Sequence, residues 1–170
     1  YYQALVYGVP DANDPRLRGV KGASFEPGNI LKLTTQLARH RTDRQRQDVC
    51  VPGGRHAVTR ARTVARLGNP EVLALMECWL ETGRTHQLRV HMAHAGHALV
   101  GDPTYGGKRK LAKGAVSDAA AEAVRSFPRQ ALHAAVLGFD HPVTGDYVRF
   151  EAPLPGDMTD LLEAVGYDLP

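Results

Sequence analysis

The sequence predicts an α+β fold with a largely antiparallel, mixed β-sheet and a few flanking helices. Predicted strands outnumber predicted helices, and the connections between them are too short for the crossovers of a doubly wound parallel sheet. The 170 residues are 43% apolar, which is enough for one sizeable core. Internal repeats and low-complexity tracts are absent, so we expect a single domain.

The first half of the chain contains the predicted strands. Residues 1–9 alternate as in a strand, and residues 10–28 contain several Pro and Gly breakers that predict a loop. Residues 56–67 are rich in Val, Thr and Arg and predict a second strand. Residues 72–80 form an apolar run of strand length, with side chains alternating between two faces.

Helical spacing begins at residues 85–94. Leu88, His91, Met92 and Ala95 recur at helical spacing, and Leu88 and Met92 are expected to face the core. Thr85 is a suitable N-cap and Gly96 a suitable C-terminal stop. Residues 100–107 then predict a tight turn.

The C-terminal part predicts two more helices around a hairpin. A short amphipathic helix is capped by Ser117 or Asp118. Residues 131–155 predict a β-hairpin that turns near residues 144–145. Asp157 is expected to cap a last helix.

The charge distribution is uneven, although the net charge is only +3 and the pI about 9.0. Between residues 32 and 66, only Asp43 and Asp48 are acidic. The basic residues of this stretch are Lys32, Arg39, Arg41, Arg44, Arg46, Arg55, Arg60, Arg62 and Arg66. Such a stripe is typical either of a polyanion-binding surface or of a solvated strand and loop face.

The cysteines and the apolar runs indicate a cytoplasmic protein. Cys50 and Cys78 lack a CxxC spacing, so we expect two reduced thiols, with Cys78 in the core. No apolar run approaches the roughly 20 residues that span a bilayer. The opening "YYQALVYG" does not have the features of a signal peptide.

Cationic side chains gather at the start of the predicted helix, in "LETGRTHQLRVHMAHAGH", residues 80–97. Arg84, His86 and Arg89 lie at or near its N-terminus, where the helix dipole already supplies partial positive charge. More positive charge is unfavourable there unless an anion is bound. We therefore expect an acidic group opposite this turn.

Three kinds of site could account for this cluster. A metal site is disfavoured because His86 and His91 are five residues apart and HExxH is absent. A nucleophilic hydrolase is disfavoured because GxSxG is absent. An anion or carboxylate clamp formed by Arg84 and Arg89 fits best. The alternative of an Arg satisfied by a structural carboxylate stays open.

Four stretches resemble the RluA-type pseudouridine synthases. They are "YYQALVYGVP", "GGRHAVTRARTV", "LETGRTHQLRVHMAHAGHALVGDPTYGG" and "ALHAAVLGFDHPVTGDYVRFEAPLPGDM". The resemblance runs in order from Tyr1 to about Val165, and "TGRTHQLRVH" is its most specific motif. It implies the pseudouridine synthase fold, incomplete at the N-terminus.

The resemblance implies isomerisation of uridine to pseudouridine without a cofactor or metal, mostly in large-subunit ribosomal RNA. The uridine is flipped out, its N-glycosidic bond is broken, the uracil rotates, and C5 is joined to C1′. Tyr2 in "YxALV" matches the Tyr that packs on the flipped base and is proposed to take the C5 proton. Arg89 in "HQLR" matches the Arg that pairs with the catalytic Asp.

The resemblance also gives the other cations a role in binding RNA phosphates. The expected RNA-binding residues are Arg84, His86, Arg39, Arg41, Arg44, Arg60 and Arg62. His86 has alternatives, since it is equally suited to orienting Arg89, to capping the helix, or to a buried hydrogen bond. For His91 and His94 we expect packing or surface positions. Tyr105 and His133 could line the pocket or fill the sheet, and we favour the latter.

The family's catalytic Asp belongs to an "HRLDxxTSG"-like motif upstream of "YxALV", and these residues do not contain it. Residues 1–170 are therefore expected to be a partial, monomeric catalytic domain that is inactive alone. Asp102 is a possible substitute, although a structural turn explains it better. A non-catalytic RNA-binding module is the alternative function, and a histidine metalloprotein is a third class.

Overall fold

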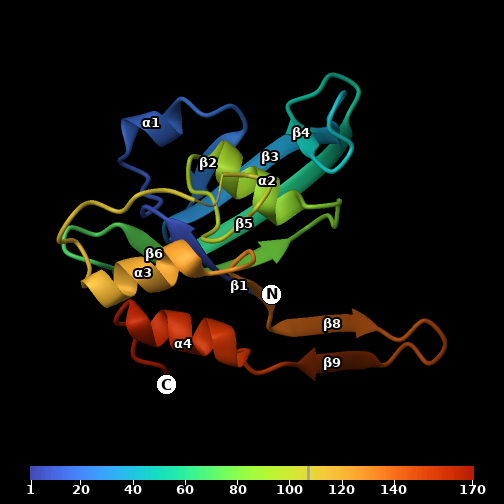
Figure 1. Ribbon diagram of the computed structural model, residues 1–170. Coiled ribbons are helices and arrows are strands. Elements are labelled where there is room, and N and C mark those ends of the chain that lie inside the picture. Colours follow the sequence, from blue (N-terminus) through green and yellow to red (C-terminus); the bar gives the residue numbers. More distant parts are fainter. Residues whose placement is uncertain (107) are drawn as a thin grey trace.

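The computed structural model describes residues 1–106 and 108–170 (Figure 1). The strands are β1 (Tyr2–Tyr7), β2 (Ala23–Glu26), β3 (Ile30–Arg39), β4 (Gln47–Val49), β5 (Arg55–Leu67), β6 (Leu73–Leu80), β7 (Leu132–Ala134), β8 (Val136–Asp140) and β9 (Tyr147–Glu151). The helices are α1 (Pro15–Arg18), α2 (Gln87–His94), α3 (Asp118–Ser126) and α4 (Gly156–Ala164).

A single sheet organises the domain. Its strand order is β2-β3-β5-β6-β1-β7, with β4 paired to the outer part of β3, and the pairings are antiparallel. Strands β8 and β9 form a separate two-stranded ribbon. The predicted α+β class with a largely antiparallel sheet is confirmed.

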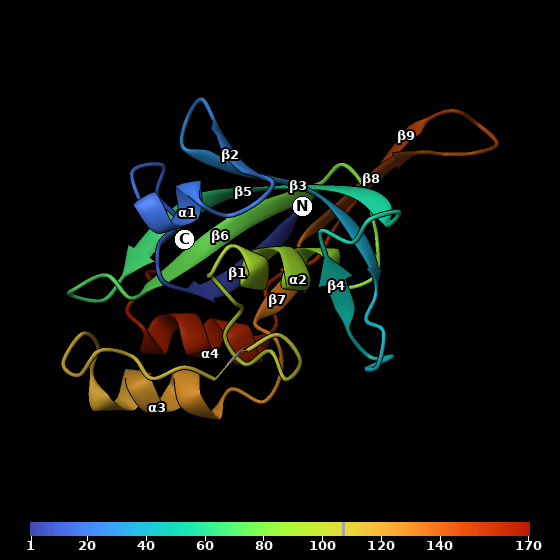
Figure 2. The ribbon, with the colours of Figure 1, turned by 90° about the horizontal axis from the view of Figure 1, so that it is seen from above.

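The two faces of the sheet carry different helices, because strand residues alternate between faces. Leu5 and Tyr7 of β1 belong to the core under α3 and α4, which pack against each other (Figure 2). Ala4 and Val6 belong to the core under α1 and α2. Each fully buried Leu contributes roughly 1.5–3 kcal/mol of transfer free energy. Helix α2 is thereby fixed on the face opposite α3 and α4.

The face of α2 was predicted correctly, but its beginning was not. Leu88 and Met92 are buried, as expected, and so are His91 and the following Ala95. The N-cap is His86, with φ of 53° and no side-chain capping bond, so Thr85 is wrong as the cap. Gly96, with φ of 86°, ends the helix as predicted.

Other elements differ from expectation in the first half of the chain. The predicted loop 10–28 contains α1 and β2. Strands β3 and β4 were not anticipated. In β3, the buried positions are Leu31, Leu33, Thr35 and Leu37. This alternation is the strand signal, and the basic residues of the same region had obscured it.

The C-terminal elements follow the predictions closely. The Ser117 hydroxyl accepts from the backbone N–H of Ala120 and caps α3. The ribbon turns between Asp140 and Tyr147. Asp157 is wrong as the cap of α4, because the N-cap is Pro155 and the Asp157 carboxylate pairs with Arg129. Gly107, the last residue of the predicted turn 100–107, lies outside the described residues.

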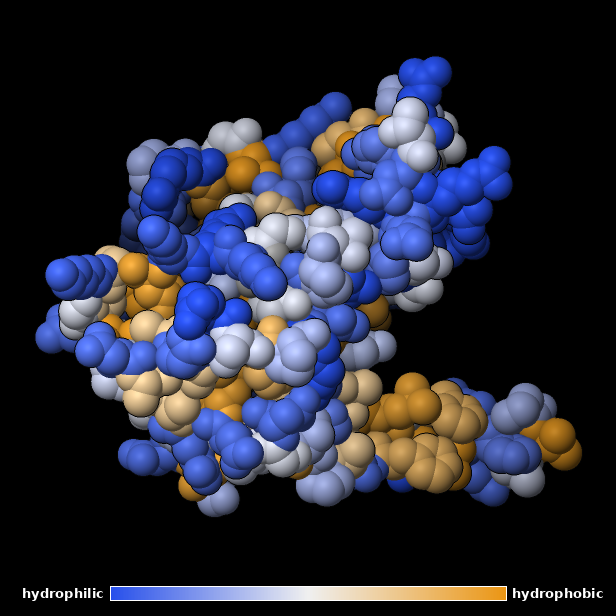
Figure 3. Space-filling model, in the orientation of Figure 1, coloured by the Kyte–Doolittle hydropathy of each residue, from blue (hydrophilic) through white to orange (hydrophobic). Residues whose placement is uncertain are grey.

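The β8–β9 ribbon projects from the body and exposes apolar side chains (Figure 3). Leu137 and Phe150 are 60% and 57% exposed. The rings of Phe139 and Phe150 stack with centroids 6.2 Å apart. Among the described residues, none of the helices has the length and apolarity needed to cross a membrane.

Candidate functional site

Arg89 of α2 holds a carboxylate from the turn that follows the helix. Its Nε donates to Asp102 Oδ2 at 2.8 Å, and its Nη2 donates to Asp102 Oδ1 at 2.9 Å. The Asp102 side chain is completely buried and that of Arg89 is 10% exposed. Asp102 is the acidic group expected opposite this turn, and it belongs to the chain itself.

The turn before Asp102 needs a glycine. Gly101 has φ of 74°, and a Cβ atom there would collide with the carbonyl oxygen of Arg129. Leu99, just before it, forms a β-bridge with Val6 of β1. The central sheet therefore fixes the position from which Asp102 reaches α2.

The Asp102 carboxylate is ionised and fully engaged. Its Oδ1 also accepts from the backbone N–H groups of Thr104 and Tyr105, at 2.9 and 3.1 Å. Burial raises the pKa of Asp102, but the hydrogen bonds from Arg89, Thr104 and Tyr105 outweigh it, and the net pKa lies below the ordinary value. With these contacts, Asp102 acts as a structural anchor that holds Arg89 in place. Nη1 of Arg89 has no hydrogen-bond partner within the described ranges.

Tyr105 joins His86 to Arg89. His86 Nδ1 lies 3.0 Å from the Tyr105 hydroxyl, and the Arg89 guanidinium carbon lies 5.2 Å from the Tyr105 ring centroid. Burial, followed by the charge of Arg89, lowers the pKa of His86 and favours its neutral form. Of the roles considered for His86, capping by its side chain is excluded, and a hydrogen bond beside Arg89 is observed.

Gln87 is a structural residue whose role was not predicted from the sequence. Gln87 as a whole is 1% exposed. Its Oε1 accepts from the Thr82 hydroxyl and the Arg84 backbone N–H, while Nε2 donates to the Val58 carbonyl and the Thr59 hydroxyl. Gln87 thus fixes the start of α2 to β5 and to the turn that follows β6. The signal available in the sequence was a polar, uncharged glutamine between Arg84 and Arg89, next to the apolar Leu88.

His91 fastens the middle of α2 to the sheet. Its Nε2 and Nδ1 are each 2.7 Å from a hydroxyl, those of Thr35 on β3 and Thr59 on β5. Burial lowers the pKa of His91 to about 4, so the ring is neutral near pH 7. The expected packing role is confirmed. Among the described residues, no group of His, Cys, Asp and Glu is arranged to hold a metal ion.

Tyr2 lies on the same face of the sheet as α2. It pairs with Cys78 on β6 and with Ala134 on β7. Its side chain packs with the apolar cluster that includes Leu88, next to Arg89 in the helix. The structure thus places the two residues matched to the family's Tyr and Arg on one face, although Arg89 itself points to Asp102 and Tyr105.

Arg84 does not join Arg89 in a clamp. Its Nε donates to the carbonyl of His56, at the start of β5, at 3.0 Å. The fork of Arg89 is already occupied by Asp102. The predicted two-arginine clamp is therefore replaced by one arginine on a structural carboxylate, the alternative left open, while Arg84 lies beside β5.

The basic stripe separates into two groups. Arg60 pairs with Glu26 and Glu81, and Arg62 pairs with Glu77. These carboxylates lie on other strands or loops, which a count along the sequence cannot reveal. The exposed arginines without an ion pair in the described part of the chain include Arg39, Arg41 and Arg44.

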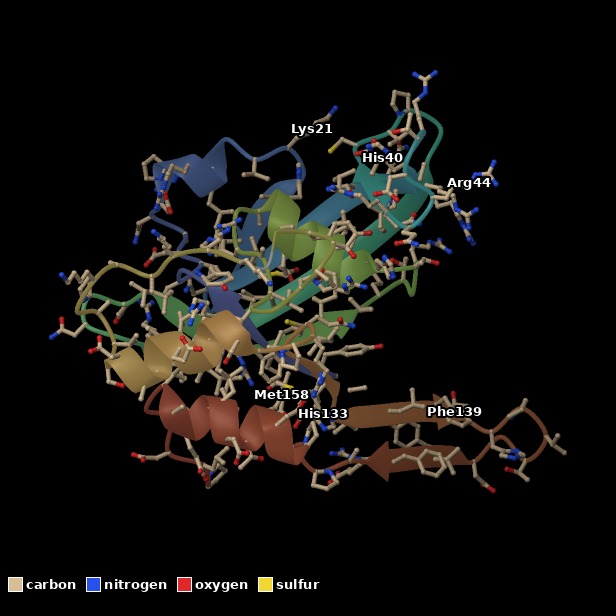
Figure 4. The ribbon with its side chains drawn as sticks, in the orientation of Figure 1. Lys21, His40, Arg44, His133, Phe139 and Met158 are labelled. Carbon is tan, nitrogen blue, oxygen red and sulfur yellow. The ribbon has the colours of Figure 1, made fainter. Side chains whose placement is uncertain are left out.

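These arginines belong to what we call the arginine arm, residues 39–47, which joins the end of β3 to β4. Figure 4 shows Arg44 at the outer end of this turn, directed away from the body of the molecule. Hydrophilic side chains cover the same end in Figure 3. The RNA-binding role expected for Arg39, Arg41 and Arg44 stays a prediction, and so does that of Arg60 and Arg62.

Comparison with known proteins places this geometry in a family. Residues 1–94 match the model of the RNA pseudouridylate synthase family. Ribosomal large subunit pseudouridine synthase D of Vibrio cholerae is 46% identical over 132 residues, which are 78% of this chain and 39% of that protein. An uncharacterized RNA pseudouridine synthase of Bacillus subtilis is 46% identical over 162 residues, which are 95% of this chain and 42% of that protein.

Solved structures show the same fold. Human RNA pseudouridylate synthase domain containing 1 has a TM-score of 0.60 at 22% identity, covering 91% of this chain and 54% of that chain. Human RNA pseudouridylate synthase domain containing 4 has a TM-score of 0.60 at 21% identity, covering 99% and 62%. The chain spans about two fifths of the length of the curated relatives it matches. On its family match and its sequence identities, the chain belongs to the RNA pseudouridylate synthase family.

Proposed function

We propose that residues 1–170 are part of the catalytic domain of a cytoplasmic, monomeric RNA pseudouridine synthase that acts on large-subunit ribosomal RNA without metal or cofactor. The observation that carries this proposal is the family match over residues 1–94, which include Tyr2, Arg84, His86 and Arg89. The names of the curated relatives support ribosomal RNA as the substrate.

In this proposal Tyr2 forms the wall against which the flipped uracil packs, and its hydroxyl accepts the C5 proton. Its position on the edge of the apolar cluster beside β7 suits stacking by an aromatic ring. The arginine arm and Arg84 supply cations for the RNA phosphates.

The role of Arg89 is to orient the catalytic carboxylate. Asp102 holds Nε and Nη2, so the Nη1 edge is the part that remains for a second carboxylate. A carboxylate on that edge would stay ionised beside the guanidinium. We expect this Asp in a segment upstream of Tyr1, as the resemblance implies.

The experiment measures tritium release from C5-labelled uridine in unmodified large-subunit ribosomal RNA. The 170-residue chain is compared with the same chain extended upstream through the expected Asp motif. We expect turnover only in the extended form. Turnover by the short chain would overturn the assignment of the nucleophile, with Asp102 the first residue to replace.

Tyr2 and its neighbour Tyr1 provide a matched pair of variants in the extended form. Tyr2→Phe keeps the ring and removes the hydroxyl, so it should lower turnover about 10²-fold or more while RNA binding is retained. Tyr1→Phe, at a 41% exposed side chain, should leave turnover unchanged. If the extended form binds this RNA but forms no pseudouridine, the alternative of a non-catalytic RNA-binding module is favoured.

A further inference from the structure

Tyr105 lies where three segments of the site meet. It is 5% exposed. Its hydroxyl accepts from the backbone N–H of Gln47, the first residue of β4, at 2.8 Å. The same hydroxyl lies 3.0 Å from Nδ1 of His86, at the start of α2. Its own backbone N–H binds Asp102.

The Gln47 N–H donates to the hydroxyl and takes one of its two acceptor positions. The hydroxyl proton and the second acceptor position are left for the hydrogen bond with His86 Nδ1, whose direction depends on the His86 tautomer. A single hydroxyl group thus links the end of the arginine arm to the first turn of α2.

The ring of Tyr105 makes a second link. The guanidinium carbon of Arg46, on the arginine arm, lies 5.6 Å from the ring centroid, and that of Arg89 lies 5.2 Å from it. Both distances are within the range of attraction between a cation and an aromatic ring, about 6 Å. The arm and the helix therefore place one cation each on the same aromatic side chain.

The orientation of Arg89 depends on Tyr105 in two ways. The ring contacts the guanidinium directly, and the Tyr105 backbone N–H helps to hold the carboxylate of Asp102, which binds Nε and Nη2. The direction of the remaining Nη1 edge follows from these contacts. A shift of the arm at Gln47 would move the ring and, with it, Arg89.

We propose that Tyr105 is a positioning residue through which the docked arginine arm sets the orientation of Arg89. The expected effect on kcat rests on the proposed function, whereas the coupling of the arginine arm to Arg89 through Tyr105 does not. It implies that the arm does more than attract RNA, since its docked position is also part of the geometry of the isomerisation site.

The kinetic test uses the complete gene product with large-subunit ribosomal RNA transcript. Tyr105→Phe keeps the ring and loses both hydroxyl contacts, so kcat should fall at least about fivefold, the loss expected for one net hydrogen bond alone, with KM within about twofold of wild type. Tyr105→Leu also loses the ring and should lower kcat further. Tyr147→Phe, on the exposed ribbon, is the matched control and should leave kcat unchanged. A wild-type kcat in both Tyr105 variants, or an effect on KM alone, would overturn the proposal.

A spectroscopic test separates the inference from the proposed function. The Nε–H resonance of Arg89 is followed by nuclear magnetic resonance in the 170-residue chain. Arg46→Ala should shift this resonance in the wild-type background and leave it unmoved in the Tyr105→Leu background. Equal shifts in both backgrounds would overturn the coupling through Tyr105. If the wild-type gene product forms no pseudouridine, the proposed function fails and this experiment alone decides the inference.

Discussion

Acidification should weaken the domain through His91. The ordinary histidine pKa is about 6.5, and burial between Thr35 and Thr59 lowers it to about 4 in the folded state. The unfolded chain therefore binds a proton more readily than the folded one. The stabilisation that comes with a neutral His91 is complete above pH 6.5 and is lost as the pH falls from 6.5 towards 4.

The magnitude follows from linkage. One pKa unit corresponds to 1.36 kcal/mol, so the free energy of unfolding should fall by about 2 kcal/mol between pH 7 and pH 5 because of His91 alone. Below pH 4 the loss should level off near roughly 3 kcal/mol. His97 is also buried, and burial lowers its pKa, so it acts in the same direction. A variant is therefore needed to isolate His91.

The assay is urea unfolding followed by circular dichroism at pH 7 and pH 5. His91→Gln keeps a donor and an acceptor for the two threonines and removes the titrating ring. It should be less stable than wild type at pH 7 but should lose about 2 kcal/mol less on acidification. His94→Gln removes a histidine near the surface of the same helix, and because its charge is the smaller cause of the low His91 pKa, it should follow the wild type closely. Equal losses in wild type and His91→Gln would refute the reasoning.

Three further predictions concern the site and its supports. Asp102→Asn leaves the buried cation of Arg89 without its carboxylate and should lower the free energy of unfolding by about 3–5 kcal/mol in urea titrations; unchanged stability would mean that water compensates the charge. Replacing Arg41 and Arg44 together by alanine should reduce the slope of log K against log salt by about 0.7 for each lost phosphate contact with single-stranded RNA, with no change in Tm; an unchanged slope would exclude them as RNA contacts. Gln87→Leu leaves several buried polar groups without partners and should cost about 1–3 kcal/mol in thermal unfolding; a smaller loss would show that the start of α2 does not depend on this amide.

The sequence predicted the packed face of α2 because helical period is a local property. Leu88, Met92 and Ala95 recur at the spacing that buries one side of any helix, and no knowledge of the sheet was required. The beginning of the helix is different. It depends on the Gln87 amide, whose partners Val58 and Thr59 on β5 are brought near only by folding. Local sequence patterns therefore favoured Thr85 as the N-cap and could not identify His86.

The charged residues show the same limit: their positions can be read from the sequence, but their ion-pair partners cannot. An excess of basic residues between positions 32 and 66 is visible in the sequence, but the carboxylates that pair with Arg60 and Arg62 come from outside that stretch. Likewise, the acidic partner of Arg89 was expected in kind but not identified as Asp102. Electrostatic reasoning predicted the need for an anion, while the topology determined which residue supplies it.

The motif "TGRTHQLRVH" is long because some of its residues hold α2 to the sheet and others orient Arg89. Thr82, Gln87 and His91 within it are occupied by hydrogen bonds that hold α2 to the sheet. His86 and Arg89 share Tyr105, and Arg89 is held by Asp102. Most of the motif thus specifies the placement of one guanidinium group, of which a single edge is left for another carboxylate. A match to this motif is therefore strong support for the scaffold, whereas catalysis depends separately on whether a carboxylate reaches that edge.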